Sequence, residues 1–439
     1  MSLLKKGLSD SKYYLLANLG NKALALLIIP ILAKSVGVEE FATYDLFLLI
    51  STFLNIFIIL GIDSGIAILL SESKDDKKQL SFFYGVSLIV SAFALFIIAL
   101  VINFLFLYFD KLFLLPQSIW NAIFLYSFFM MITYHTFNFL RWQEQAKEAS
   151  FVTLFSYLLG MLIGVSFLYF QTDINTYLKG LIIGVAVGAC VALYIARDYL
   201  REFQYDRSKK EKIFELFKLS LPFVPNYLGN SLMQMADRIV IVMLFGKYEL
   251  GVYALITKLA MIPQIILGTL TGGFLPVMYS NYKSKKGKEL IKNFFHAYLL
   301  IIPLAFIVAY FCKDLAVALF GGEKYIEYAY LLPMALVAIL FVRTTQANGF
   351  GYSIQRKTHY IMYITFLTVV LNYIFSFAFA SFIGLEGVII GTLFAGIIRT
   401  YLHTYYSEKL YRFGYSFIFI TFIASITLAL LFYTLKEIG

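Results

Sequence analysis

Five basic residues lie inside segments that are otherwise apolar: Lys22, Arg238, Lys258, Arg343 and Arg399. A charge in the middle of a membrane-spanning helix costs roughly 2.5–3.5 kcal/mol on insertion scales, so it persists where it faces protein or water. Acidic residues are scarce in the same segments. An arginine guanidinium offers paired, charge-assisted hydrogen bonds to phosphate oxygens. The excess of cations therefore predicts a cavity for an anionic group such as a diphosphate.

The cations differ in how far they lie from the ends of their apolar segments. Lys22 and Arg343 lie near the middle of theirs, where a long side chain reaches water least easily. We therefore predict that both face the cavity. Lys258 lies near one end of its segment and fits either a cavity role or a side chain extended to the membrane surface. Arg399 fits either a cavity role or an anchor at the opposite interface.

Polar side chains accompany the cations at helical spacing. A polar face on several apolar helices indicates a shared hydrated cavity, although Asn and Thr side chains also form hydrogen bonds between helices. The polar residues that we expect to support the cavity are Asn18, Asn21, Asn230, Gln234, Gln346 and Asn372.

Asp237 stands next to Arg238, and the two fit either an ion pair that fixes their helix or two groups in the cavity. Asp63, Asp237 and His135 are the residues that could carry a coupling ion, H⁺ or Na⁺. His135 also fits an interior histidine whose ring is satisfied by neighbours. The sequence has neither a catalytic constellation nor a metal-ligand spacing, so we expect no catalytic residue, no metal and no cofactor.

The elements that position these residues are membrane-spanning helices. The chain has 439 residues, of which 61% are hydrophobic and 14% are charged, against about 45–50% and 25% in soluble domains. Its apolar runs are long enough to cross about 30 Å of hydrocarbon. We predict an all-α polytopic membrane protein. The spans lie at about 13–35, 41–70, 81–109, 118–140, 151–170, 177–197, 216–245, 250–280, 294–320, 329–353, 360–383 and 387–406, with a further apolar segment at about 416–435.

Basic residues concentrate in alternate loops. Most of the 36 lysines and arginines lie in the N-terminal segment and near 74–78, 141–147, 197–218, 283–292, 356–357 and 409–412. The positive-inside rule places the N-terminus and these loops in the cytoplasm. The net charge of +10 is therefore a topology signal, and we expect the lipid bilayer rather than nucleic acid as a partner.

The chain divides into two halves of similar design. The motif Gly37–Tyr44 recurs as Gly246–Tyr253, with Gly, Glu and Tyr at the same spacing. Six spans in each half give both the same direction, which predicts two six-helix bundles in a pseudo-two-fold parallel repeat. The predicted parts are an N-lobe at 1–198, a cytoplasmic linker at 199–215, a C-lobe at 216–406 and a C-terminal segment at 407–439 with room for an additional membrane helix.

Five segments carry a family pattern. The most specific is SLPFVPNYLGNSLMQMADRIVIVMLFGKYELGVYALITKL (220–259). The others are LAKSVGVEEFATYDLF (32–47), FLPVMYS (274–280), LFGGEKY (319–325) and GLEGVIIGTLFAG (384–396). Together they resemble Wzx-type O-antigen and polysaccharide flippases, in the polysaccharide transporter family of the multidrug/oligosaccharidyl-lipid/polysaccharide (MOP) superfamily.

The resemblance implies two MATE-like lobes around a central cavity that opens alternately to either side of the bacterial inner membrane. The implied substrate is an oligosaccharide on polyprenyl diphosphate, carried from the cytoplasmic to the outer leaflet for O-antigen, lipopolysaccharide or other surface polysaccharide biosynthesis. Polysaccharide polymerase machinery is the implied protein partner. The resemblance transfers no binding residue by motif.

Two other classes of membrane protein fit the sequence less well. A cation-coupled multidrug antiporter of the same superfamily generally uses intramembrane acids, whereas the first span offers Asn18, Asn21 and Lys22. A membrane glycosyltransferase or polymerase needs an acid–base or metal-binding loop, and the longest loop here is short and basic. We therefore predict a transporter and not an enzyme.

Overall fold

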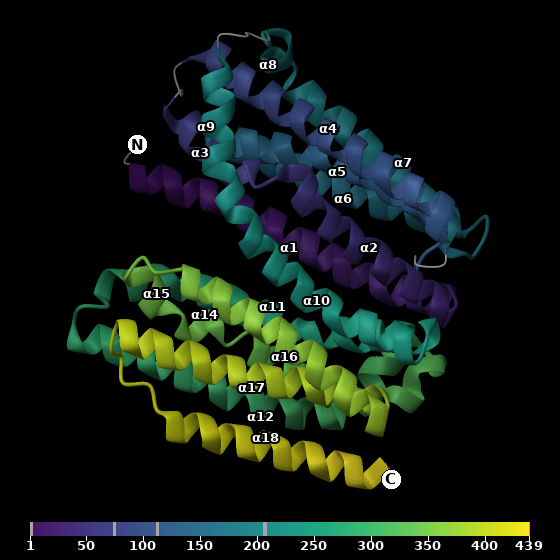
Figure 1. Cartoon of the computed structure of the whole chain (residues 1–439), viewed down its shortest axis with the longest axis vertical. Coiled ribbons are helices and arrows are strands. Elements are labelled where there is room, and N and C mark those ends of the chain that lie inside the picture. The colour runs from purple at the N-terminus through teal and green to yellow at the C-terminus, as the bar shows by residue number, and fades with distance from the viewer. Residues whose placement is uncertain (1–2, 73–75, 111–113, 205–208, 439) are drawn as a thin grey trace. The chain divides into compact units, whose positions relative to one another are not determined.

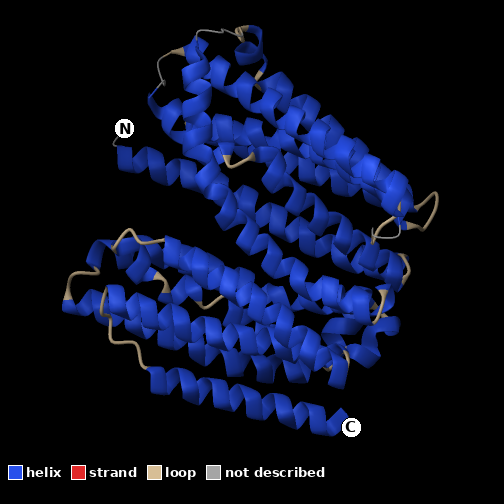
Figure 2. Ribbon diagram, viewed as in Figure 1, coloured by secondary structure: helices blue, strands red, loops and turns tan. Residues whose placement is uncertain are grey.

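The computed structural model describes residues 3–72, 76–110, 114–204 and 209–438. Lys74 and Arg207, which contribute to the predicted orientation, lie outside these ranges. Figure 2 shows helices joined by loops, and the described ranges contain no strand. The prediction of an all-α protein is confirmed.

Contacts within the chain divide it into two units, Met1–Leu228 and Gly229–Gly439. The division falls inside a helix and later than the linker expected at 199–215. The helices of unit 1 are α1 (Leu3–Ser35), α2 (Val38–Ile59), α3 (Ile62–Glu72), α4 (Lys77–Phe109), α5 (Gln117–Trp142), α6 (Ala146–Leu168), α7 (Ile174–Ile195), α8 (Arg197–Arg201) and α9 (Lys210–Ser220) (Figure 1).

α10 (Val224–Leu244) begins in unit 1 and continues into unit 2. The helices that follow are α11 (Lys247–Asn281), α12 (Lys285–Gly321), α13 (Leu331–Val342), α14 (Thr345–Asn348), α15 (Phe350–Ile354), α16 (His359–Ile383), α17 (Leu385–Leu410) and α18 (Phe417–Ile438). Two 3-10 helices, η3 (Leu221–Phe223) and η4 (Glu323–Tyr328), precede α10 and α13.

Twelve helical segments of the described ranges are long and apolar enough to cross a membrane. α18 supplies one of them, Phe417–Lys436. α10 is not among them, although a span was predicted there. Its polar residues, which include Gln234, Asp237 and Arg238, lower its mean hydropathy. Its 21 residues would still extend about 30 Å as a helix.

Side-chain caps fix where several helices start. Asp76, Asp173 and Ser284 precede α4, α7 and α12, and each accepts hydrogen bonds of 2.9 to 3.1 Å from backbone N–H groups of the following turn. Such caps satisfy donors that have no partner within the helix. These polar residues therefore mark the ends of apolar helices.

The span predicted at 41–70 is wrong as a single helix. It consists of α2 and α3, which are separated at Leu60 and Gly61, both in the left-handed region with φ of 53° and 71°. Glycine adopts this conformation at no steric cost. A Cβ atom on Gly61 would also lie 2.4 Å from the backbone oxygen of Ser220. Gly61 therefore allows both the bend and the close packing of α9 on α3.

Two other predicted spans are also interrupted. The span at 216–245 consists of α9, η3 and α10, with Pro222 and Pro225 at the joint. Proline lacks a backbone N–H and disrupts the helical ladder. The span at 329–353 consists of α13, α14 and α15. Its first interruption lies at Arg343 and Thr344, and Arg343 lines the site described below.

Glycines set the closest helix pairs. A Cβ atom on Gly184 of α7 would lie 2.6 Å from the Cα atom of Gly160 on α6. A Cβ atom on Gly391 of α17 would lie 2.4 Å from the backbone nitrogen of Ser376 on α16. Small residues allow such close approach between membrane helices, where van der Waals packing drives association. The two pairs are the fifth and sixth predicted spans of each half.

Candidate functional site

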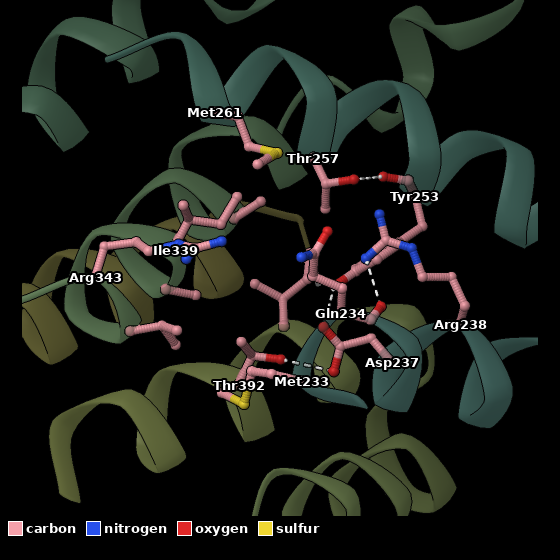
Figure 3. A pocket seen from close by; sticks show the side chains of 14 residues that line it. Met233, Gln234, Asp237, Arg238, Tyr253, Thr257, Met261, Ile339, Arg343 and Thr392 are labelled. Atoms are coloured by element: carbon pink, nitrogen blue, oxygen red, sulfur yellow. Dashed lines mark hydrogen bonds between the residues drawn. The ribbon is translucent and has the colours of Figure 1, made fainter. Parts of the chain in front are cut away.

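Unit 2 holds a cavity of about 80 Å³ that is lined by α10, α11, α17 and the end of α13. Apolar side chains of α13 form part of its wall. The polar side chains that reach it include Gln234, Asp237, Arg238, Tyr253, Arg343 and Thr392. In Figure 3, Arg343 lies on one side of the cavity, and Asp237 and Arg238 lie on the other.

Asp237 is the most densely bonded group of this cavity. Its side chain is 4% exposed. Its carboxylate accepts hydrogen bonds from Tyr253 Oη at 2.5 Å, Asn372 Nδ2 at 2.8 Å and Thr392 Oγ1 at 3.0 Å, and a longer one from Ser376 Oγ at 3.5 Å. A buried carboxylate is costly unless such bonds replace water. Asp237 therefore connects α10 to α11, α16 and α17.

Arg238 follows Asp237 on α10 and extends toward α11. Its guanidinium lies 5.3 Å from the centre of the Tyr253 ring, and its Nη1 donates to the Gln234 carbonyl at 3.1 Å. Tyr253 therefore contacts both charged residues, with its hydroxyl on Asp237 and its ring facing Arg238. The arrangement keeps a cation at the cavity beside a buried carboxylate.

Arg343 lies where α13 ends and the chain turns into α14. Its side chain is half-buried and lines the cavity. Among the described residues, its guanidinium has neither a hydrogen bond nor an ion pair. Ligand phosphate oxygens could therefore bind this guanidinium without displacing a protein partner.

Neighbouring hydroxyl groups add hydrogen bonds to two backbone carbonyls beside the break at Arg343, which also accept backbone bonds from the N–H groups of Arg343 and Thr344. Tyr298 Oη donates to the Leu340 carbonyl at 3.1 Å. The hydroxyls of Thr344 and Thr400 donate to the Phe341 carbonyl at 2.9 and 3.2 Å. Interrupted helices at membrane depth persist where protein or water satisfies the freed groups. The break is therefore stabilised by side-chain contacts within unit 2.

Arg399 lies on α17, outside the lining of this cavity, and its side chain is 6% exposed. Its Nε donates to Thr345 Oγ1 at 3.3 Å, and its Nη2 donates to Thr365 Oγ1 at 3.2 Å. It lies within electrostatic range of Arg343. Arg399 thus has neutral partners and keeps its positive charge close to the broken helix.

The structure brings some of the predicted site residues together in one cavity. Gln234, Asp237, Arg238 and Arg343 line one cavity. Asn372 lies next to it through its bond to Asp237.

The lining of this cavity does not include the other predicted residues of unit 2, which are Lys258, Asn230, Gln346 and Arg399. Lys258 is half-buried and Asn230 is exposed, while the side-chain oxygen of Gln346 has no partner among the described residues.

The remaining predicted residues belong to unit 1. Lys22 and Asn18 on α1 are exposed, and Lys22 has no bonded partner among the described residues. The Oδ1 atom of Asn21 has no hydrogen-bond partner there. Asp63 accepts hydrogen bonds from Tyr134 at 2.8 Å and Tyr227 at 3.3 Å.

His135 is buried in unit 1, and its Nε2 lies 2.8 Å from Ser91 Oγ. This contact fits an interior histidine whose ring is satisfied by a neighbour, one of the two roles expected for His135.

Three further residues, Tyr253, Ser376 and Thr392, complete the Asp237 cluster. Ser376 follows Asn372 by four positions on α16, so the two share a face of that helix. That spacing was the available signal for Ser376. Tyr253 lies in an almost wholly buried run of α11, where sequence alone favours a core residue.

Comparisons with known proteins place the chain in context. A family model described as "Polysaccharide biosynthesis protein" matches residues 8–281. The chain is 23% identical over 350 residues to the "Lsg locus putative protein 1" of Haemophilus influenzae, which covers 75% of this chain and 82% of that protein.

Two solved structures are similar in fold. An inward-facing multidrug resistance MATE transporter of the MOP superfamily has a TM-score of 0.64 at 19% identity and covers 90% of this chain and 94% of its own. The lipid II flippase MurJ, in an inward closed conformation, has a TM-score of 0.63 at 16% identity and covers 95% of this chain and 91% of its own.

Proposed function

The chain belongs to the polysaccharide biosynthesis protein family and has the fold of MOP-superfamily transporters, and we propose that it is a lipid-linked oligosaccharide flippase. The substrate is an oligosaccharide attached to polyprenyl diphosphate. It moves from the cytoplasmic to the outer leaflet of the bacterial inner membrane, and the N-terminus lies in the cytoplasm. Alternating exposure of a hydrated site to the two sides carries the headgroup, while the polyprenyl chain stays in lipid.

The observation that carries this proposal is the arrangement of Arg238 and Arg343 in the cavity of unit 2. Both guanidinium groups reach a space with largely apolar walls, and Arg343 has no bonded partner among the described residues. A diphosphate is the headgroup component that binds arginine most strongly, through paired hydrogen bonds. The cavity of about 80 Å³ has room for a phosphate group rather than for a whole oligosaccharide, so the proposed contact is with the charged end.

Lys22, Lys258 and Arg399 remain proposed as additional cations along the substrate path. Lys22 is exposed on α1 of unit 1 and has no bonded partner among the described residues. Arg399 reinforces the positive potential at Arg343 from within unit 2.

Asp237 is the residue that we propose for ion coupling, in preference to Asp63 and His135. It is buried, and hydroxyl oxygens of Tyr253, Ser376 and Thr392 lie around it. The Val388 carbonyl oxygen also lies close by, 3.2 Å from Ser376 Oγ and 3.0 Å from Thr392 Oγ1. A buried carboxylate with neutral oxygen neighbours fits a proton or a Na⁺ ion. When bound, either would neutralise the carboxylate and so alter the contacts that join α10 to three other helices.

The proposed function is tested in two assays. A host strain that lacks this protein should accumulate the lipid-linked oligosaccharide on the cytoplasmic side and lose the surface polysaccharide, and the cloned chain should restore both. In proteoliposomes, the chain should expose a labelled polyprenyl-diphosphate oligosaccharide to an added glycosidase. Normal surface polysaccharide in the deletion strain, together with no exposure of the labelled lipid, would reject the proposal.

A multidrug antiporter is the second candidate, because the fold of the chain is also that of MATE transporters. Overexpression in a drug-sensitive strain separates the two functions: an antiporter raises resistance to organic cations, whereas a flippase does not.

A complex with polysaccharide polymerase machinery is proposed as well, and co-purification from the native host tests it.

A further inference from the structure

A second cavity, of about 380 Å³, lies in unit 1 and takes no part in the function proposed above. α1, α6 and the end of α7 line it. Its walls are mainly apolar and include Leu16, Ala17, Phe151 and Leu154. Its volume falls in the range of roughly 300–1,000 Å³ that is typical of small-molecule sites. An apolar groove in a membrane protein fits a hydrocarbon chain.

The residues of α6 that line this groove change character along the helix. Lys147 and Glu148 come first, in the first turn, followed by Ser150 and then by Phe151 and Leu154. At 1.5 Å per residue, Ser150 lies about 4.5 Å and Leu154 about 10.5 Å further along the axis than Lys147. The groove therefore runs from charges through one hydroxyl to apolar side chains.

Three polar side chains of the groove, those of Lys147, Glu148 and Ser150, have no bonded partner within the part of the chain that the structure describes. The Ser150 side chain is 7% exposed, and its hydroxyl has no hydrogen-bond partner among the described residues. Lys147 and Glu148 are exposed, and neither has a bonded partner among those residues. α6 also begins without a side-chain cap, so its first N–H groups are open to an anion. A buried hydroxyl without a partner is costly and points to a ligand atom.

We infer that this groove binds a phospholipid whose headgroup carries both a phosphate and a primary ammonium. Lys147 and the first turn of α6 face the phosphate, and Glu148 faces the ammonium. The Ser150 hydroxyl donates to an ester carbonyl, and one acyl chain lies along Leu16, Phe151 and Leu154. An anionic lipid would leave Glu148 unmatched, so the paired charges favour the zwitterion.

The surrounding residues agree with a lipid at this depth. The predicted topology places the start of α6 at the cytoplasmic surface, which is the level of the headgroups. Tyr13 on α1 lines the same groove, and tyrosine side chains favour the membrane interface. The inference does not depend on what the protein transports.

The test is native mass spectrometry of the purified full chain from nanodiscs that contain equal amounts of phosphatidylethanolamine, phosphatidylglycerol and a polyprenyl phosphate. We expect phosphatidylethanolamine to be retained at least about 5-fold over phosphatidylglycerol. The double variant Lys147→Gln/Glu148→Gln should lose this preference. Lys285→Gln/Glu289→Gln, which removes an exposed Lys and Glu from the first turns of α12, is the matched control and should keep it.

Reversing the charge at position 148 gives a further test of the inference. Glu148→Lys should reverse the preference toward phosphatidylglycerol, because two cations then face the headgroup. Ser150→Ala should reduce retention without changing the preference. Equal retention of both phospholipids by the unmodified chain, or no retained phospholipid, would overturn the inference. Preferential retention of the polyprenyl phosphate would also overturn it and would assign the groove to the transported lipid.

Discussion

Asn372 donates a 2.8 Å hydrogen bond to the Asp237 carboxylate, and this contact joins α16 to α10 within unit 2. The same carboxylate holds Tyr253 of α11 and Thr392 of α17. One buried carboxylate thus joins four helices. This geometry is the reason to expect that an ion at Asp237 changes the stability of the unit as well as transport.

Replacing Asp237 by Asn keeps the shape of the side chain and removes its charge. If Na⁺ binds there, it should raise the melting temperature of the unmodified protein and leave that of Asp237→Asn unchanged. A ligand at 100 times its Kd stabilises the folded state by about 2.7 kcal/mol, which is measurable by thermal unfolding in detergent. Transport by the variant should fall at least about 10-fold and lose its ion dependence.

Asp314→Asn is the control for this experiment, since Asp314 lies on α12 with a largely exposed side chain. It should keep the full response to Na⁺. If neither Na⁺ nor a change of pH affects the unmodified protein and Asp237→Asn differently, Asp237 has no coupling role.

Arg343→Ala should lower transport while leaving protein level and melting temperature nearly unchanged, because the guanidinium has no bonded partner among the described residues. A hydrogen bond to a charged group contributes about 1.5–3 kcal/mol, which corresponds to a loss of roughly 10- to 100-fold. Arg343→Lys should be intermediate, since it keeps the charge and loses the paired geometry. The flipping rate in proteoliposomes is the measurement.

Arg412→Ala serves as the control, because Arg412 is an exposed cation of unit 2 outside the cavity. It should transport at the normal rate. A normal rate for Arg343→Ala as well would remove Arg343 from the substrate site.

The fold class follows from composition and from the length of the apolar runs, because a membrane helix must satisfy its backbone internally. The interruptions are harder to predict. The bend at Leu60 and Gly61 depends on the approach of Ser220 from α9. The carbonyls beside the break at Arg343 accept hydrogen bonds from hydroxyls of α12 and α17. Both places involve partners distant in the chain, which hydropathy does not register.

The candidate site shows the same limit. The cations and the Asn372 face could be found from helical spacing, since a polar residue in an apolar run has an evident cost. Their grouping could not, because it depends on which face of α16 and α17 packs against α10. Arg399 illustrates this: sequence left it between two roles, and its bonds to Thr345 and Thr365 become visible only with the helices in place.

Gly391→Ala should destabilise unit 2. The new Cβ atom would lie 2.4 Å from the backbone nitrogen of Ser376, and a backbone atom cannot rotate away. Overpacking of this kind typically costs about 1–3 kcal/mol, so the melting temperature should fall by several degrees. Gly268→Ala is the matched control, because its Cβ atom would meet nothing closer than 3.7 Å. Equal melting temperatures for the two variants would contradict the close packing of α16 and α17.

The Asp173 cap should make the stability of unit 1 vary with pH in the acid range. Partial burial raises the pKa of its carboxyl, but hydrogen bonds from Thr176 and Asn175 outweigh this and lower the pKa overall. Because the folded-state pKa is depressed, the cap contributes fully above the unfolded pKa of about 3.9 and is lost as the pH falls through the folded value.

Asp173→Ala should therefore cost about 1 kcal/mol at pH 7, and its deficit should shrink as the pH falls below about 4. Asp173→Asn keeps a capping oxygen without a charge, so its stability relative to Asp173→Ala should not vary with pH. Thermal unfolding in detergent between pH 3 and pH 7 measures both differences. A deficit for Asp173→Ala that stays constant over this range would show that the charge of Asp173 does not stabilise the start of α7.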